Sequence, residues 1–507
     1  MTRFAELVRV SKQVAATSSR LAKIRELADF LRRLDPGEIA LALPYLSGDI
    51  RQGKLAVGYA ALQSARSAPA RAASLKLRDI DAAFQKLKAV KGKGAAGQRS
   101  IELRQLFQQA TEDEQDFLMR LVVGELRQGA LEGIMSEAVA AASGVPAAEV
   151  RRAAAFAGAL APVAAAALAG KSLDEFSVRP MQPVLPMLAQ AAEDMRAALA
   201  EIGTALLEWK LDGARVQVHK AGGEVRVYTR NLNDVTARVP EIVSCVKSTS
   251  ADSLILDGEA IALRPDRRPH PFQVTMQRFG SQQPGEAPRP LSAFFFDCLY
   301  LDGVPLFDHP TRERRAALES ALASTVLTPA IVTADVTQAQ AFYRKALDAG
   351  HEGVMAKALD APYTAGRRGS GWLKVKRART LDLVVLAAEW GHGRRRGWLS
   401  NLHLGARDPA GGGYVMLGKT FKGLTDATLE WQTRELEKLA LQRDEWVVHV
   451  KPQLVVEIAF NDLLESPQYP GGLALRFARV KGYRPDKRPE DADTIDTVRR
   501  IYQESIA

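Results

Sequence analysis

The first 175 residues carry a helical pattern of apolar and polar positions. Apolar residues recur at intervals of three and four, as in Phe117, Leu121, Val122 and Leu126, and Ala, Leu, Arg, Glu and Gln dominate the region. This spacing places the apolar side chains on one face of a helix. A basic segment with several glycines at 86–100, KLKAVKGKGAAGQRS, interrupts the pattern and predicts an exposed loop.

The pattern changes twice further along the chain. The run VRPMQPVLPM at 178–187 contains three prolines, which exclude a regular helix and predict a domain boundary. From about residue 200, apolar positions alternate with a period of two, which predicts antiparallel strands. Helical patterns return near 311–325 and 335–349.

A third change follows Lys376. Short alternating segments separated by turn residues predict a small barrel or sandwich, with one helix at about 424–440. We therefore expect a helical domain at 1–177, a mixed α/β domain at 178–379 and a small β domain at 380–507. Three domains agree with the length of 507 residues, because single cores rarely exceed about 300 residues.

Composition narrows the function classes. Lys and Arg outnumber Asp and Glu by 69 to 59, a net charge of +10 that favours a polyanionic partner such as nucleic acid. Two cysteines exclude a disulfide framework and a cysteine-rich zinc module. The first residues have no apolar signal segment, and no apolar run reaches the ~20 residues that span a bilayer. We expect a cytoplasmic protein with no membrane partner, associated with the nucleoid if its source is prokaryotic.

One apparent motif is misleading. The segment at 413–420, GYVMLGKT, fits the Walker A spacing of phosphate-binding loops. Its four inner residues are Tyr, Val, Met and Leu, which favour a paired strand over a phosphate-wrapping loop. We therefore predict a strand here, with Lys419 facing DNA or solvent.

The segment from Glu208 to Arg215, EWKLDGAR, concentrates reactive groups. Alternating runs on both sides of its Asp-Gly pair predict a hairpin, and period two places Glu208 and Lys210 on one strand face. At a pKa of about 10.4, roughly one lysine in a thousand is neutral near pH 7. Burial and the nearby Arg215 would lower the pKa of Lys210 and make it a nucleophile. The alternative is an exposed ion pair on a hairpin.

KLDGAR at 210–215 resembles the nucleotidyl-lysine motif of the covalent nucleotidyltransferases, which comprise DNA ligases, RNA ligases and capping enzymes. Further family motifs follow in order. The segments of this chain that resemble them are LDGEAI at 256–261, FFFDCLYLDG at 294–303, EGVMAK at 352–357, WLKVK at 372–376 and ALRFARVKGYRPDK at 474–487. The last resembles the terminal motif of ATP-dependent DNA ligases of the archaeal and eukaryotic replicative type. The resemblance implies an all-α DNA-binding domain, an α+β adenylation domain with antiparallel sheets and a C-terminal OB-fold barrel.

The resemblance also implies roles for residues around ATP. Lys210 would become adenylated, Glu208 would recognise adenine, and Arg215 would hold the ribose or phosphate side. Arg230 matches the family arginine on the next strand. Phe296, whose side chain shares a strand face with Phe294, would stack on the adenine ring.

Carboxylates and cations would complete this site. Glu259, rather than Asp257 on the same strand face, matches the residue for ribose or metal, and Glu352 matches a second carboxylate for Mg²⁺ or Mn²⁺. The cations that match family positions for nucleotide phosphates are Lys357, Lys374, Lys376 and Arg368, the last with Arg367 as an equally basic neighbour. In the terminal motif, Arg476 and Lys487 would close over ATP and orient pyrophosphate.

The helical region resembles the domain that grips duplex DNA in this family. Segment 117–135 is similar to a helix-to-turn element in which Arg120 and Arg127 lie seven residues apart on one helix face. Gly129 would permit close approach of the backbone to DNA. An ordinary amphipathic helix with a glycine cap is the alternative, and the basic loop at 86–100 matches no family pattern.

These features predict an ATP-dependent DNA ligase that binds nicked duplex DNA as a monomer encircling it. An NAD-dependent ligase is disfavoured, because two cysteines cannot form the four-cysteine zinc site of that family. An RNA ligase or a capping guanylyltransferase is the alternative enzyme, and a DNA-bridging protein with a decayed nucleotidyltransferase fold is the non-enzymatic alternative. The sequence does not distinguish a role in DNA replication from one in repair or recombination, or from a backup role.

Overall fold

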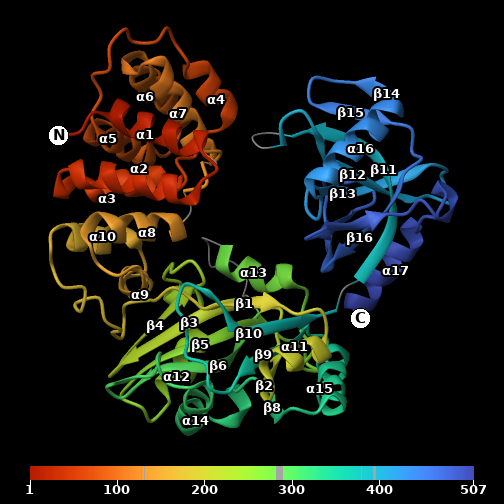
Figure 1. Cartoon of the computed structure of the whole chain (residues 1–507). Helices are drawn as coiled ribbons and strands as arrows, with labels where there is room; N and C mark the ends of the chain where they lie inside the picture. Colours follow the sequence, from red (N-terminus) through yellow and green to blue (C-terminus); the bar gives the residue numbers. More distant parts are fainter. Residues whose placement is uncertain (127, 131, 281–288, 378, 392–394, 507) are drawn as a thin grey trace. The chain divides into compact units, whose positions relative to one another are not determined.

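The computed structural model describes residues 1–126, 128–130, 132–280, 289–377, 379–391 and 395–506 (Figure 1). The chain divides into two compact units. The first comprises 1–187 together with 364–367, and the second comprises 188–363 together with 368–507.

The first unit is helical, as the apolar spacing predicts. Phe4, Phe84 and Phe117 are fully buried in one continuous apolar core. The proline-rich run at 178–187 contains no helix. The helices are α1 (Phe4–Ala16), α2 (Arg20–Arg33), α3 (Pro36–Ser47), α4 (Tyr59–Ala65), α5 (Leu77–Ala89), α6 (Ala95–Gln109), α7 (Glu112–Val123), α8 (Glu132–Ser143), α9 (Ala147–Ala157) and α10 (Leu160–Leu168).

The prediction of a long exposed loop at 86–100 is wrong. Helices α5 and α6 take up most of this segment and leave only 90–94 between them. Gly92 and Gly94 have φ angles of +87° and +84°, a left-handed conformation that glycine adopts without strain and that reverses the chain quickly. Arg99 on α6 donates hydrogen bonds to main-chain oxygens at the end of α5 and the start of the loop.

An antiparallel sheet forms one half of the central region. Its strand order is β4-β3-β5-β6-β7, and Val218, Leu254 and Phe295 lie fully buried in the core beside it. Helices α12 (Pro240–Lys247) and α14 (Thr311–Ala321) pack against β6. The strands are β3 (Ala214–Ala221), β4 (Glu224–Thr229), β5 (Ser253–Ala262), β6 (Leu291–Leu301) and β7 (Val304–Pro305).

A second sheet of the central region has the strand order β1-β10-β9-β2-β8, in which only the β1–β10 pair is parallel. Helices α11 (Met195–Ile202) and α15 (Val336–Asp348) contribute Met195 and Phe342 to its core. The strands are β1 (Leu188–Ala191), β2 (Ala205–Lys210), β8 (Ala330–Thr333), β9 (Gly353–Ala358) and β10 (Arg368–Lys376). A further helix, α13 (Phe272–Gly280), follows β5.

The hairpin predicted at Asp212-Gly213 is wrong, because β2 and β3 belong to different sheets. Strand β2 pairs with β8 and β9, whereas β3 pairs with β4 and β5. Gly213 does not form a hairpin turn; its lack of a side chain allows its backbone to pack closely against β5. A Cβ at this position would lie 2.4 Å from the carbonyl oxygen of Ala260 and 2.9 Å from Cγ of Glu259.

We expect Gly213→Ala to destabilise the protein by about 1–3 kcal/mol, since backbone of β5 must move to relieve the overlap. Urea unfolding of the two proteins measures the change. Gly223→Ala is the matched control, because a Cβ there meets no atom within 4 Å. Equal stability of the two variants would contradict the steric role of Gly213.

The C-terminal part is rich in sheet, with one large antiparallel sheet. Its order is β13-β12-β11-β15-β14, and β16 pairs with both β11 and β19. Helix α16 (Asp426–Lys438) lies within the range predicted, and α17 (Ile495–Ile506) ends the described chain. The strands are β11 (Arg379–Trp390), β12 (Leu399–Arg407), β13 (Tyr414–Thr420), β14 (Ala440–Arg443), β15 (Val447–Val450), β16 (Val455–Phe460) and β19 (Arg479–Tyr483), and a separate pair is formed by β17 (Asp462–Glu465) and β18 (Leu473–Arg476).

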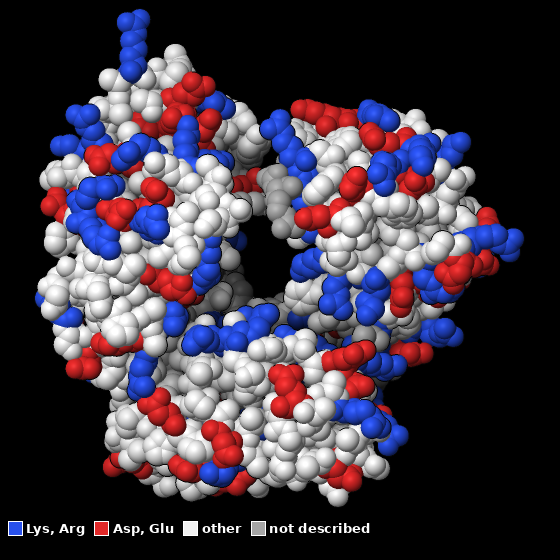
Figure 2. Space-filling view, viewed as in Figure 1, with Lys and Arg blue, Asp and Glu red and all other residues white. Residues whose placement is uncertain are grey.

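The segment with Walker A spacing forms strand β13, which confirms the prediction of a strand. Lys419 forms an ion pair with Glu389, and 37% of its side chain is exposed. Figure 2 shows basic and acidic side chains interspersed over the face in view, with no single sign covering it. None of the helices in the described ranges combines the length and apolarity needed to cross a bilayer.

Candidate active site

A pocket of about 630 Å³ in the second unit brings the predicted nucleotide residues together. Side chains from both central sheets line it, and β18 contributes one residue. The predicted residues in its wall are Glu208, Lys210, Arg215, Arg230, Glu259, Phe296, Glu352, Lys357, Arg368, Lys374, Lys376 and Arg476. Residues more than 260 positions apart in the sequence therefore share one cavity.

Lys210 ends strand β2 beside Glu352, which directly precedes β9. The N–H of Glu352 donates to the carbonyl oxygen of Lys210 at 3.0 Å, and their side chains form an ion pair. Lys376 on β10 contacts the same carboxylate at 2.7 Å. This pairing follows from the order of the sheet, in which β9 lies between β2 and β10.

The structure corrects the expected protonation of Lys210. Burial lowers its pKa, but the carboxylates of Glu352 and Glu259 outweigh burial, and the pKa is raised. Arg215 does not act on the lysine in the way the sequence suggested. Its guanidinium donates to both carboxylate oxygens of Asp257, at 2.9 and 2.6 Å, and to the hydroxyl of Tyr363 at 3.2 Å. Lys210 is consequently held in its charged form in the free protein.

Two carboxylates in the pocket provide oxygen donors for a divalent cation. Glu259 lies opposite Arg215 in the β3–β5 register, and burial raises its pKa to about 8 despite Lys210 and Arg215. Within the described parts of the chain, no group of three or more His, Cys, Asp or Glu side chains could hold a metal ion by itself. A site with few carboxylates suits Mg²⁺, which keeps several waters and binds substrate phosphates. Glu259 and Glu352 fit such an ion.

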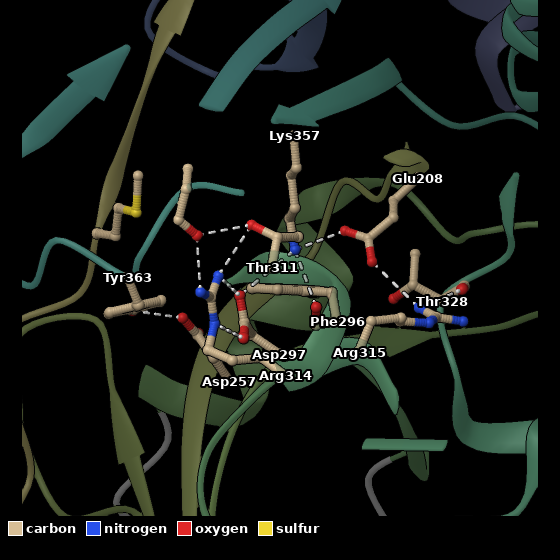
Figure 3. Close-up of polar contacts among 12 residues, drawn as sticks. Glu208, Asp257, Phe296, Asp297, Thr311, Arg314, Arg315, Thr328, Lys357 and Tyr363 are labelled. Carbon is tan, nitrogen blue, oxygen red and sulfur yellow. Dashed lines mark hydrogen bonds and ion pairs between the residues drawn. The ribbon is translucent and has the colours of Figure 1, made fainter. Parts of the chain in front are cut away.

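Buried polar contacts of Glu208 and Lys357 with their neighbours lie at the floor of the pocket (Figure 3). Phe296 meets Trp372 edge to face, with ring centroids 6.0 Å apart. The ammonium of Lys357 lies 4.4 Å from the centroid of Trp372 and 4.9 Å from that of Phe296. It contacts Glu208 Oε2 at 2.7 Å and donates to the carbonyl oxygen of Phe296 at 2.9 Å. Burial raises the pKa of Glu208, whereas Lys357 and Arg315 oppose that rise.

This placement does not match the phosphate role predicted for Lys357. Its side chain is 1% exposed, and its charge is matched by the equally buried Glu208. A buried ion pair beneath aromatic rings fixes their position and offers little charge to a ligand. The structure thus assigns Lys357 to the floor of the pocket.

Strand β10 supplies the cations that face the open side of the pocket. Lys374 and Lys376 alternate on one face of the strand, as the period of two predicts, and Arg368 begins it. Burial, together with neighbouring cations, lowers the pKa of both lysines. Arg230 follows β4 and is exposed at the rim. These four side chains give the pocket a positive charge, which the ion pair between Lys376 and Glu352 neutralises only in part.

The two predicted residues of the terminal motif lie in different places. Arg476 on β18 donates to Asp212 at 3.0 Å and stacks on Phe272, 3.8 Å from the ring centroid. Lys487 instead pairs with Asp382 on β11 at 2.5 Å. In this conformation Arg476 reaches the pocket and Lys487 stays with the C-terminal sheet.

Comparison with known proteins identifies the family. Three family models match consecutive parts of the chain: DNA ligase N terminus at 53–140, ATP dependent DNA ligase domain at 186–376 and ATP dependent DNA ligase C terminal region at 395–487. A Probable DNA ligase from Anaeromyxobacter sp. (strain Fw109-5) is 58% identical over 99% of this chain and 98% of its own length. The chain belongs to the ATP-dependent DNA ligases.

Further matches agree with this assignment. A Probable DNA ligase from Sorangium cellulosum (strain So ce56) is 53% identical over 99% of this chain and 96% of its own length. The solved structure titled Pmar-Lig_PreS3 aligns with 94% of this ligase and 99% of that chain at a TM-score of 0.65 and 18% identity, a likeness of fold. The family predicted from six ordered motifs is confirmed.

The predicted DNA-binding element of the ligase lies at the end of α7 and in the segment after it. Helix α7 ends at Val123, and Gly124 after it has a left-handed conformation. Arg120 lies in the last turn of α7, whereas Arg127 lies outside the described residues. Gly129 has a φ of +72°, and Lys23 Nζ would lie 2.7 Å from a Cβ placed there. The early stop of α7 follows from its glycine cap.

The sequence analysis missed four residues of the ligase, three buried and one partly buried, that hold the pocket in place. Tyr363 donates to Asp257 at 2.7 Å and so supports Arg215. Arg314 and Arg315 on α14 contact Asp297 and Glu208 at 2.7 and 3.1 Å. Asp297 was visible as the residue after Phe296 in its motif, but the arginines lie in TRERRAALES, which reads as a solvated helix. No periodic signal marks them as buried.

Proposed function

We propose that this ligase seals nicks in duplex DNA through a lysyl-AMP intermediate on Lys210. The observation that carries the proposal is the position of Lys210 in the pocket wall. Its side chain contacts Glu352, whose carboxylate also contacts Lys376 on β10. A nucleophile, a carboxylate and several cations in one cavity are what phosphoryl-group chemistry requires.

The reaction would proceed in three steps. Nζ of Lys210, after losing a proton, attacks the α-phosphorus of ATP, so that a P–N bond forms and the bond to pyrophosphate breaks. The 5′-phosphate at a nick then attacks the same phosphorus and releases the lysine. Finally the 3′-hydroxyl attacks the 5′-phosphate, the phosphodiester forms and AMP leaves. Glu352, in contact with Lys210, is the group placed to accept the proton of the ammonium in the first step.

The remaining side chains would bind and orient the nucleotide. Glu208 would recognise adenine, Phe296 would stack on its ring, and Arg215 and Arg230 would hold the ribose and phosphate side. Lys374, Lys376, Arg368 and Arg476 would neutralise the phosphates. Mg²⁺, or Mn²⁺ in its place, would be held by Glu259 and Glu352 and would supply charge for the triphosphate.

The other regions would bind DNA. The division at 1–177, 178–379 and 380–507 would give a helical domain that grips duplex DNA, an adenylation domain and an OB-fold. Arg120, Arg127 and Gly129 stay candidates for DNA contacts, and Lys487 for a contact with ATP after movement of the C-terminal part. Contacts with the sugar-phosphate backbone of DNA recognise its charge and shape and not its base sequence, as the joining of arbitrary nicks requires. We propose a monomer bound around nicked duplex DNA.

Nucleotide labelling of the full chain tests the proposal. The protein is incubated with ATP, GTP or NAD⁺ and Mg²⁺, the covalent adduct is located by peptide mass spectrometry, and sealing of nicked DNA and RNA strands is measured in parallel. We expect AMP on Lys210 from ATP and sealing of nicked DNA. An adduct formed only from GTP would indicate a capping enzyme, and the absence of any adduct would overturn the mechanism.

A further inference from the structure

Helix α14 sends two of its arginines toward the nucleotide pocket, although its sequence is that of a surface helix. The side chains of Arg314 and Arg315 are 0% and 12% exposed, whereas that of Arg312 on the same helix is 59% exposed. Arginine is rarely buried unless it is paired. The residues that pair with these two arginines therefore indicate why they are buried.

Arg315 forms an ion pair with the carboxylate of Glu208 (Figure 3). Its Nη1 lies 3.1 Å from Oε1 of Glu208, while Lys357 Nζ lies 2.7 Å from Oε2. Each carboxylate oxygen therefore has one cationic partner. The other side of Arg315 contacts Glu319 at 2.7 Å and anchors the guanidinium near the surface.

Arg314 fixes the neighbouring part of the floor. It contacts both carboxylate oxygens of Asp297, at 2.7 and 3.2 Å, and donates to the main-chain oxygens of His309 and Ala361. Asp297 directly follows Phe296, so this network sets the backbone that carries the aromatic ring. The two arginines thus fix the two sides of the base-binding floor.

A carboxylate has about four acceptor positions, and one partner on each oxygen leaves others available. Glu208 lines the pocket, so an exocyclic amino group of adenine is a suitable donor to it. Two cations oriented on Glu208 oppose the rise in its pKa that burial causes, and they hold its oxygens in one direction. A protonated or rotated carboxyl would present a donor toward that amino group or turn away from it.

We propose that Arg315 is a positioning residue for base specificity, which orients the Glu208 carboxylate to accept a hydrogen bond from the 6-amino group of adenine. The inference rests on the proposed function, because it assumes that ATP occupies this pocket. Glu208 lines the pocket, whereas Arg315 lies outside that lining. Its effect is transmitted through Glu208.

The test compares ATP with purine riboside 5′-triphosphate, which lacks the 6-amino group. Self-adenylation of the full-length protein is measured with each nucleotide, and the ratio of the two kcat/KM values is determined. We expect a ratio of about ten or more for the unmodified protein, because a charged hydrogen bond is lost with the analogue. In Arg315→Met we expect that ratio to fall below about three.

Arg312→Met is the matched control, since Arg312 lies on the same helix and pairs with the exposed Asp360. Its ratio should equal that of the unmodified protein. A purely structural loss in Arg315→Met would slow both nucleotides equally and leave the ratio unchanged, which would overturn the inference. If Arg315→Met does not fold, Arg315→Lys, which keeps the charge but not the planar group, should lose about threefold in the ratio, and an unchanged ratio would again overturn it.

The outcomes separate this inference from the proposed function. No covalent adduct with either nucleotide in the unmodified protein would overturn both. Adduct formation with equal kcat/KM for ATP and the analogue, or with a ratio that Arg315→Met does not change, would overturn only the role of Arg315.

Discussion

Lys210→Ala is expected to abolish formation of the covalent AMP adduct and to lower nick sealing with ATP by about 10⁴-fold or more. Alanine has no atom that can attack the α-phosphorus. The adduct is measured by mass spectrometry of the intact protein. Sealing is measured with a nicked duplex and excess ATP.

A second substrate locates the loss in the first step. A nick whose 5′-phosphate already carries AMP needs no lysyl adduct, so Lys210→Ala should still seal it without ATP. Lys345→Ala on the exposed side of α15 serves as the control and should behave like the unmodified protein. Sealing of an ordinary nick by Lys210→Ala with ATP would refute the lysyl-AMP mechanism.

Glu352→Gln is expected to slow self-adenylation by about 10²–10³-fold. The carboxylate of Glu352 contacts both Lys210 and Lys376, at 2.7 Å for Lys376, and it is the closest acceptor for the lysine proton. The amide keeps the shape of the side chain but removes its charge, its basicity and its affinity for Mg²⁺. Single-turnover adenylation at saturating ATP measures the effect.

A titration with Mg²⁺ shows whether metal binding is part of the loss. We expect Glu352→Gln to need more Mg²⁺ for half-maximal adenylation than the unmodified protein. Glu313→Gln is the control, because Glu313 is 52% exposed and pairs with His309, outside the pocket lining. A rate within twofold of the unmodified protein in Glu352→Gln would exclude both of the roles proposed for this carboxylate.

Several features of the ligase were predictable from local sequence. The switch from a helical period to a period of two marked the change from the helical region to the sheets. The same alternation placed Phe296 on the opposite strand face from the fully buried Phe295, and it placed Lys374 and Lys376 on one face of β10. Strand β13 was predictable because its inner residues favour a strand although its glycine and lysine spacing resembles a phosphate-binding loop.

Other features depended on pairing between distant segments. Alternation on both sides of Gly213 correctly indicated two strands, but a period of two does not specify a strand's partner. The pKa of Lys210 moved opposite to the expected direction, because Glu352, 142 positions away, lies against the lysine and Arg215 is occupied by Asp257. Electrostatic effects depend on distances of a few ångströms, which sequence spacing does not provide.

The sequence by itself determined the order of the helical and sheet regions, the six motifs and the family. These are local properties, since periodicity, turn residues and short motifs are set by neighbouring residues. Only the tertiary structure decided that Lys357 lies buried beside Phe296, that α7 stops at Val123 and that Arg314 and Arg315 pair with Asp297 and Glu208. Burial of a charged side chain depends on a partner brought by another element, here Glu208 and Asp297, and that partner is known only once the chain has folded.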